Sequence, residues 1–143
     1  NAWGGFGNGG QYTSSSFPIA VAGNQRWQSV APGTTHTCGV ATTGDAYCWG
    51  MQTRSQLGLG TTTPTTLLVP TPVVGGLRFS QLVSGDFHSC ALTTAGDAYC
   101  WGENTNGQLG IGASGDRAAP TAVAGGVRFR ALSAGASHTS EST

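Results

Sequence analysis

The chain has 143 residues, of which 24 are glycine and only 8% are charged, and its six basic and six acidic residues give a formal net charge of zero. A neutral chain without clustered Lys or Arg lacks the electrostatic footprint of a nucleic-acid-binding protein and the polybasic segment of a protein that binds anionic membranes. No apolar run approaches the roughly 20 residues of a membrane-spanning helix, and a start at Asn1 without a signal peptide indicates a mature, processed or excised polypeptide.

A unit of about fifty residues repeats along the chain, with copies expected at approximately 3–48, 49–100 and 101–143. The tetrapeptide Tyr47–Gly50 returns 52 residues later as Tyr99–Gly102, in each case as Tyr-Cys-Trp-Gly. The first copy, with Trp3-Gly4 and Gln11, fits with a one-residue insertion and a shorter loop. Three consecutive copies indicate a repeat architecture in which neighbouring units share their cores.

Each copy is expected to be all-β. Short runs of Val, Leu, Phe, Tyr, Trp and Thr alternate with glycine-rich turns, and no long segment has a helical period. The clearest element is a hairpin in which Thr42-Thr43-Gly44 forms a three-residue loop with Gly44 in the left-handed conformation. This loop closes on the pair Ala41 and Asp45, and that pair sets the register of the two strands.

The hairpin register predicts two disulfides. Counting outward from Ala41 and Asp45 places Cys38 opposite Cys48 in a non-hydrogen-bonded pair, which is the closer kind of cross-strand pair. The same count places Cys90 opposite Cys100 in the second copy. Disulfides imply an oxidising compartment, here extracellular or periplasmic. The alternative is two pairs of reduced, buried thiols.

These motifs resemble a known family. The segment Trp101–Gly112, read as Trp-Gly-Glu-Asn-Thr-Asn-Gly-Gln-Leu-Gly-Ile-Gly, is similar to the regulator of chromosome condensation repeat, and the resemblance extends over nearly the whole chain. The resemblance implies a β-propeller, commonly seven-bladed, with four antiparallel strands in each blade. It also implies a bacterial, exported protein, because such members often carry the hairpin cysteines. Members of the family have diverse roles that share a protein-binding face of the propeller, and no cofactor is implied.

The two ends of the chain are expected to belong to one blade. When Trp3 is aligned with Trp49 and His138 with His36, Ala2 and Ser140 fall at cysteine positions. Residues 1–5 would then complete a blade that residues 130–143 begin. Because three blades do not close a ring, one chain would complete the last blade of a neighbour in a head-to-tail oligomer. The alternative is that the chain is one piece of a longer propeller or a subunit of a larger complex.

The recurring polar residues are interpreted as structural. His36, His88 and His138 occupy one repeat position, and no CxxC or HExxH spacing accompanies them, so no metal site is expected. Asp45 and Asp97 follow the turn glycines and are interpreted as turn residues. The recurring tryptophans are assigned to blade packing, and the recurring arginines to backbone carbonyls or an acid in a neighbouring blade. Nothing forms a catalytic constellation, so no enzyme activity is expected.

Binding is instead assigned to loops that differ between copies, because a rigid scaffold presents binding residues on its loops. We predict a non-catalytic binding or scaffold protein with a protein partner and without nucleic-acid binding or membrane insertion. The alternative is a carbohydrate-binding propeller, whose sugar site would recur in every copy. The candidate loop residues come from all three copies and are Met51, Gln52, Arg54, Glu103, Asn104, Asp116, Arg117, Phe6, Asn8 and Tyr12.

Overall fold

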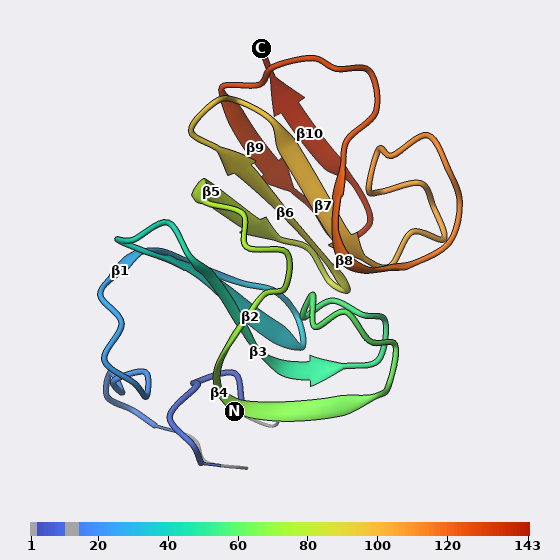
Figure 1. Ribbon diagram of the computed structural model, residues 1–143. Coiled ribbons are helices and arrows are strands. Elements are labelled where there is room, and N and C mark those ends of the chain that lie inside the picture. Colours follow the sequence, from blue (N-terminus) through green and yellow to red (C-terminus); the bar gives the residue numbers. More distant parts are fainter. Residues whose placement is uncertain (1–2, 11–14) are drawn as a thin grey trace.

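The computed structural model describes residues 3–10 and 15–143, and these contain strands and turns but no helix, hence none that could cross a membrane. The first sheet has the order β1-β2-β3-β4 and the second β5-β6-β7-β8, and a third contains β9 and β10 (Figure 1). Every pair is antiparallel. The all-β class and the four-stranded antiparallel units predicted from the sequence are therefore confirmed. The strands are β1 (Trp27–Pro32), β2 (His36–Ala41), β3 (Ala46–Gln52), β4 (Thr65–Pro72), β5 (Phe79–Ser84), β6 (His88–Thr93), β7 (Ala98–Gly102), β8 (Arg117–Ala122), β9 (Ala131–Ala134) and β10 (Thr139–Ser142).

The hairpin between β2 and β3 has the predicted register. The Ala41 amide donates to the Asp45 carbonyl at 2.9 Å, and the Gly44 amide donates to the Ala41 carbonyl at 2.8 Å. Gly44 has a φ of 88°, which is the left-handed conformation that the loop requires. Cys38 lies opposite Cys48, and the two form a disulfide with a Cα–Cα distance of 4.1 Å.

The hairpin between β6 and β7 repeats this arrangement. Cys90 lies opposite Cys100, and their disulfide has the same Cα–Cα distance of 4.1 Å. All four cysteines are fully buried. Both predicted disulfides are therefore confirmed, and the alternative of reduced thiols is wrong for this structure.

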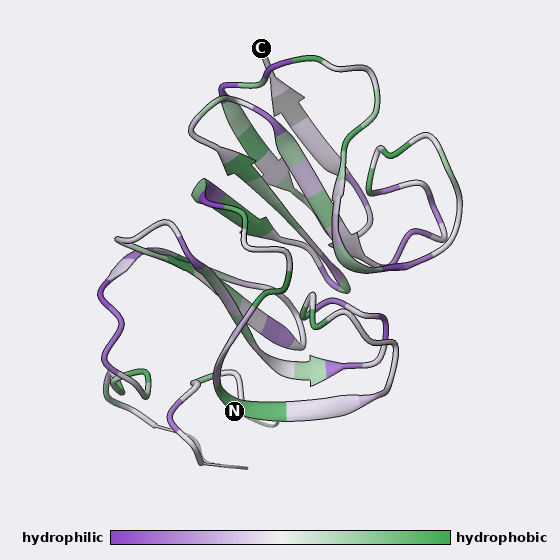
Figure 2. Ribbon diagram, in the orientation of Figure 1, coloured by the Kyte–Doolittle hydropathy of each residue, from purple (hydrophilic) through white to green (hydrophobic). Residues whose placement is uncertain are grey.

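The hydrophobic core lies between successive sheets rather than within one of them. One cluster joins Cys38, Val40 and Leu57, from the first sheet and its β3–β4 loop, to Phe79 and Trp101 of the second sheet. A second cluster joins the second and third sheets, and it contains Cys90, Leu92, Ala98, Cys100, Leu109 and Leu132. Hydrophobic residues accordingly recur along the strands, whereas hydrophilic residues are more frequent in the connecting loops (Figure 2).

Trp101, Arg78 and Arg128 contact the preceding sheet as predicted, whereas Trp49 packs against Trp27 of its own sheet. Trp49 and Trp101 are 1% and 0% exposed, and burying a side chain of this size contributes roughly 4–6 kcal/mol. Arg78 donates to the Thr43 carbonyl at 2.7 Å, and Arg128 donates to the Ala95 carbonyl at 2.6 Å. Trp3, by contrast, is 44% exposed and does not pack within a blade.

Candidate functional site

Three equivalent loop segments, 3–10, 54–61 and 106–113, follow one pattern, and together we call them the loop face. In each, an amide donates back to the carbonyl three residues earlier: Gly7 to Gly4 at 2.9 Å, Gly58 to Ser55 at 3.1 Å and Gly110 to Gly107 at 3.0 Å. The φ angles of Gly7, Gly58 and Gly110 are 63°, 65° and 61°. One rigid framework therefore presents three different loop sequences.

This equivalence corrects the sequence alignment of the first copy. The Gly5 carbonyl accepts the indole N–H of Trp49 at 3.0 Å, as the Gln56 carbonyl accepts that of Trp101 at 3.0 Å. Gly5 is thus the counterpart of Gln56, and Trp3 is the counterpart of Arg54 rather than of Trp49. The sequence alignment matched the Trp-Gly dipeptide of residues 3–4 to that of residues 49–50, which lie in β3. In the fold, Trp3 instead takes the position of Arg54, which follows β3. Gln11, used in that alignment, lies outside the described residues.

The correction bears on the expected completion of a blade by residues 1–5. Residues 3–5 lie in the loop face beside the first sheet, where Gly5 contacts Thr37 and Trp49. Residues 1–2 lie outside the described residues. Pairing of these residues with a neighbouring chain stays a prediction.

A buried chain of hydrogen bonds links the loop face to the neighbouring sheets. The Ser89 hydroxyl donates to the Gln56 carbonyl at 3.3 Å, and His36 Nε2 lies 2.9 Å from the same hydroxyl. The same hydroxyl also lies 3.4 Å from Cys38 Sγ. His36 Nε2 therefore has a hydrogen-bond partner in Ser89, whereas His36 Nδ1 is buried without one.

Burial lowers the pKa of two of the recurring histidines, His36 and His88. Desolvation is the main cause that lowers the pKa of His36 to about 4, and the nearby His88 lowers it further while Asp86 opposes the shift. Desolvation likewise lowers the pKa of His88, again against Asp86. Within residues 3–10 and 15–143, no three His, Cys, Asp or Glu side chains gather in a way that would hold a metal ion. His36 Nε2 and His88 Nε2 instead make hydrogen bonds between sheets, with the hydroxyls of Ser89 at 2.9 Å and Thr139 at 3.0 Å.

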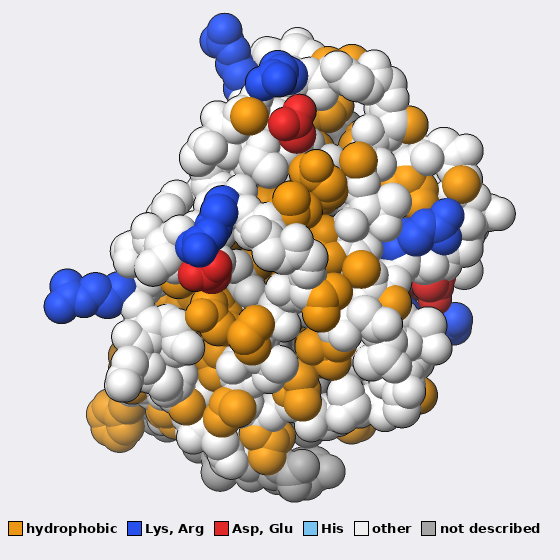
Figure 3. All heavy atoms as spheres, viewed as in Figure 1, with side chains coloured by type: hydrophobic (Ala, Val, Ile, Leu, Met, Phe, Trp, Pro, Cys, Tyr) orange, Lys and Arg blue, Asp and Glu red, His pale blue; other side chains and the backbone are white. Residues whose placement is uncertain are grey.

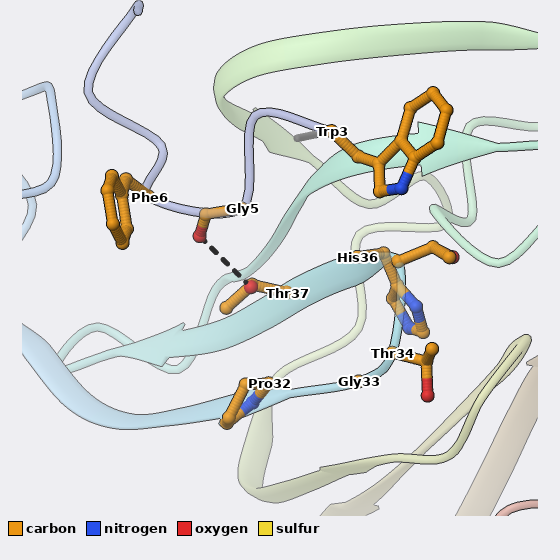
Figure 4. Close-up of a pocket in the computed structure, with 9 residues that line it drawn as sticks. Trp3, Gly5, Phe6, Pro32, Gly33, Thr34, His36 and Thr37 are labelled. Carbon is orange, nitrogen blue, oxygen red and sulfur yellow. Dashed lines mark hydrogen bonds between the residues drawn. The ribbon is translucent and has the colours of Figure 1, made fainter. Parts of the chain in front are cut away.

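A groove with a volume of about 510 Å³ opens at the first-repeat end of the loop face. Trp3, Gly5 and Phe6 form one wall, and the turn from Pro32 to Thr37 forms the other (Figure 4). Thr37 donates to the Gly5 carbonyl across the groove at 3.2 Å. The walls carry no charged side chain, because the buried His36 is neutral. Exposed aromatic surface without charge suits an uncharged, partly apolar ligand.

Two of the predicted binding residues, Gln52 and Asn104, are buried and shape the loops instead. Gln52 is 0% exposed, and its amide nitrogen donates to the carbonyls of Thr61 and Thr63, both at 3.1 Å. Asn104 is 1% exposed and donates to the Ala113 carbonyl at 2.7 Å. Since neither presents a surface, we remove both from the binding candidates.

The remaining candidates lie at or near the surface. Arg54 and Glu103 form an ion pair at 3.7 Å that joins loops of neighbouring repeats. The Asp116 carboxylate accepts the backbone N–H of Asn104 at 3.0 Å, and Arg117 donates to carbonyls within its own turn. Phe6 lines the groove, and Met51 is half-buried near the end of β3. The Asn8 side chain accepts the backbone N–H of Gly10 at 3.0 Å. Tyr12 lies outside the described residues.

Sequence reasoning missed the residues that organise the face, namely Gln56, Ser89 and Thr37. Their signal was recurrence: Thr37, Ser89 and Thr139 each follow the repeated histidine, so a hydroxyl recurs at that position. Charged side chains are present at the loop face, namely Arg54 within it and its ion-pair partner Glu103 beside it. Figure 3 shows hydrophobic side chains through the middle of the viewed side, with most Arg, Asp and Glu side chains nearer its margins.

Comparison with known proteins gives consistent matches. Two profiles of the regulator of chromosome condensation (RCC1) repeat match the chain, one at residues 27–56 and 79–108 and the other at residues 43–92 and 95–140. The ultraviolet-B receptor UVR8 of Arabidopsis thaliana is 36% identical over 121 residues, which are 80% of this chain and 27% of that protein. The probable E3 ubiquitin-protein ligase HERC4 of Homo sapiens is 37% identical over 93 residues, 62% of this chain and 8% of that protein. The chain thus spans about a quarter or less of these relatives.

Solved structures show the same fold. Yeast RCC1 (Prp20), solved with bound Kap60, superposes with a TM-score of 0.82 at 20% identity and covers 97% of this chain and 36% of that chain. Human WBSCR16 superposes with a TM-score of 0.76 at 25% identity, over 90% of this chain and 35% of that chain. The β-propeller class predicted from the sequence is confirmed by these likenesses.

Proposed function

Because the chain belongs to the regulator of chromosome condensation (RCC1) repeat family, we propose that it is a non-catalytic module that binds another protein through its loop face. The observation that carries the proposal is the groove at Trp3 and Phe6, where aromatic side chains lie on a framework fixed by disulfides and buried hydrogen bonds. Aromatic residues on a rigid support are frequent anchors of protein interfaces.

The groove fits an apolar or uncharged segment of a protein better than a repeated sugar. A sugar site in every copy would use the recurring tryptophans, and Trp49 and Trp101 are buried. Only Trp3 of this set is exposed, and its loop position is held by Arg54 and Asn106 in the other copies. A site with different side chains in each copy supports recognition of one protein surface.

We further propose that the protein works outside the reducing cytosol, in an extracellular or periplasmic space. The support is the pair of buried cross-strand disulfides, which persist in oxidising compartments. We also propose a scaffold role, because the disulfides give the loop face a rigid support. A head-to-tail homo-oligomer stays a further proposal, and native mass spectrometry of the unreduced protein tests it.

The binding proposal is tested by comparative affinity capture. Wild-type protein, Trp3→Ala and Phe17→Ala are immobilised in parallel and exposed to an extracellular or periplasmic extract. Phe17 is the matched control, because it is 80% exposed and does not line the groove. We expect one or more proteins retained by wild type and by Phe17→Ala but depleted from Trp3→Ala. Equal retention by all three would refute the groove as the binding site, and a glycan array on the same proteins tests the sugar alternative.

A further inference from the structure

The loop that joins β3 to β4 carries a threonine-rich segment that does not line the groove at Trp3. Residues 61–66 read Thr-Thr-Thr-Pro-Thr-Thr. Residues 61–64 are exposed, whereas Thr65 and Thr66 begin β4 (Figure 1). Segments rich in Ser or Thr that also contain Pro are typical of O-glycosylated regions. Composition treats these threonines alike, so the structure decides which hydroxyl is available.

The backbone of this segment is held in place from the protein interior. Gln52 is buried, and its side-chain nitrogen donates to the carbonyls of Thr61 and Thr63, both at 3.1 Å. Pro64 restricts the residue before it to an extended conformation. The main chain is therefore fixed on both sides of Thr62, and the loop presents this residue from a supported position.

Thr62 differs from its two neighbours in the state of its hydroxyl. The Thr61 hydroxyl donates to Thr63 Oγ1 at 3.0 Å and accepts the backbone N–H of Thr63 at 3.2 Å. Thr62 is exposed and makes no hydrogen bond with any residue in the part of the chain that the structure describes. An enzyme can therefore reach the Thr62 hydroxyl without breaking a contact of the folded protein.

Thr71 provides the comparison that separates structure from composition. It lies between Pro70 and Pro72, so its sequence surroundings are as rich in proline as those of Thr62. In the fold, Thr71 lies in β4 opposite Cys48 of β3, and its hydroxyl donates to the Val69 carbonyl at 3.2 Å. The composition suits modification at both threonines, whereas the structure leaves only Thr62 available.

We propose that Thr62 is a site of O-glycosylation. Its Oγ1 attacks the anomeric carbon of a sugar that is activated as a glycosyl phosphate ester, the donor class of glycosyl transfer. A C–O bond forms between Thr62 and the sugar, the bond from the anomeric carbon to the donor's phosphate oxygen breaks, and the hydroxyl proton passes to a base of the transferase. No oxidant or reductant takes part. The inference rests on the proposed location outside the reducing cytosol and is independent of the groove at Trp3.

Peptide mass spectrometry of the protein isolated from the organism that makes it tests this site. The sample is first alkylated without reduction, which records whether its cysteines are in disulfides. Trypsin then cleaves after Arg54 and Arg78 and releases residues 55–78, a peptide without cysteine that contains both Thr62 and Thr71. Electron-transfer fragmentation locates the modified residue. We expect hexose or N-acetylhexosamine on Thr62 at least about tenfold more often than on Thr71, because Thr71 becomes accessible only when β4 opens locally.

Two matched variants made in the same organism assign the sugar to one hydroxyl. Thr62→Ala should lose the added sugar mass on the peptide of residues 55–78, and Thr71→Ala should retain it. Because Thr62 is exposed and makes no hydrogen bond with the described residues, Thr62→Ala should leave the urea midpoint unchanged. Unfolding therefore separates a lost modification from a lost fold.

The outcomes distinguish this inference from the proposals on which it rests. Sugar on Thr62 of the wild type that is absent from Thr62→Ala supports it. An unmodified peptide from protein with intact disulfides overturns it and leaves the proposed location standing, whereas free thiols together with an unmodified peptide overturn both. Sugar spread evenly over the threonines of the peptide, or a phosphate in its place, also overturns the assignment to Thr62.

Discussion

Replacing Cys90 and Cys100 together with alanine removes a cross-link between β6 and β7 whose ends are separated by 10 residues. In the chain-entropy description, a link closing a loop of about 10 residues stabilises the folded state by about 2.7 kcal/mol. Domains of this size are stable by roughly 5–15 kcal/mol, so the loss is a large fraction of the total. Both sulfurs are fully buried, and their removal adds a packing loss to this figure.

Urea unfolding followed by tryptophan fluorescence measures this effect. With a denaturant slope of about 1–3 kcal/mol per molar, the midpoint should fall by about 1–3 M. A variant with alanine at Cys38 and Cys48, compared oxidised and reduced, separates the two contributions, because reduction then breaks only the Cys90–Cys100 link and retains both of its sulfurs. A change in the free energy of unfolding below about 0.5 kcal/mol in the double variant would refute the reasoning that the hairpin disulfides hold the sheets.

Three further predictions follow from contacts between sheets. Ser89→Ala should cost about 1–3 kcal/mol in urea unfolding, because it leaves the buried His36 Nε2 without its hydrogen-bond partner, whereas Ser114→Ala at an exposed turn should be neutral. The pKa of His36 is about 4 in the folded protein and 6.5 in the unfolded chain, so the folded state binds fewer protons between these values. The free energy of unfolding should therefore be highest above pH 6.5 and decrease toward pH 4, by at most about 1.4 kcal/mol per pH unit. A urea midpoint that does not fall over this range contradicts the assignment. Arg78→Ala should change the free energy of unfolding by less than about 1 kcal/mol, because its ion pair with Asp45 is solvent-exposed, and a larger loss in a thermal melt would show that the pair is structurally essential.

The parts of the fold predicted from the sequence are those set by local chemistry. The glycine at position 44 and the closing pair Ala41 and Asp45 fix the turn, and the turn fixes which cysteines face one another. Because the unit repeats, the same register also predicts the disulfide of the second hairpin. A short sequence separation and a known turn geometry therefore sufficed for both disulfides.

The parts that the sequence did not give depend on contacts between distant segments. Gln52 and Asn104 were placed among the binding residues because their loops differ between copies and binding residues usually lie on loops. In the fold their side chains are buried and donate hydrogen bonds to loop carbonyls. This burial depends on the path of each loop, which the sequence pattern does not predict. Trp3 was aligned by its dipeptide, whereas its place is set by the Gly5 carbonyl beneath the Trp49 indole.

Binding at the groove is the central claim, and a titration tests it most directly. A protein captured by the wild type is purified and titrated against wild type, Trp3→Ala and Phe17→Ala by isothermal calorimetry. The account predicts that Trp3→Ala raises Kd by about tenfold or more, since losing an exposed aromatic anchor costs more than about 1.4 kcal/mol, and that Phe17→Ala leaves Kd unchanged. Equal Kd values for all three proteins, each verified as folded, would contradict it.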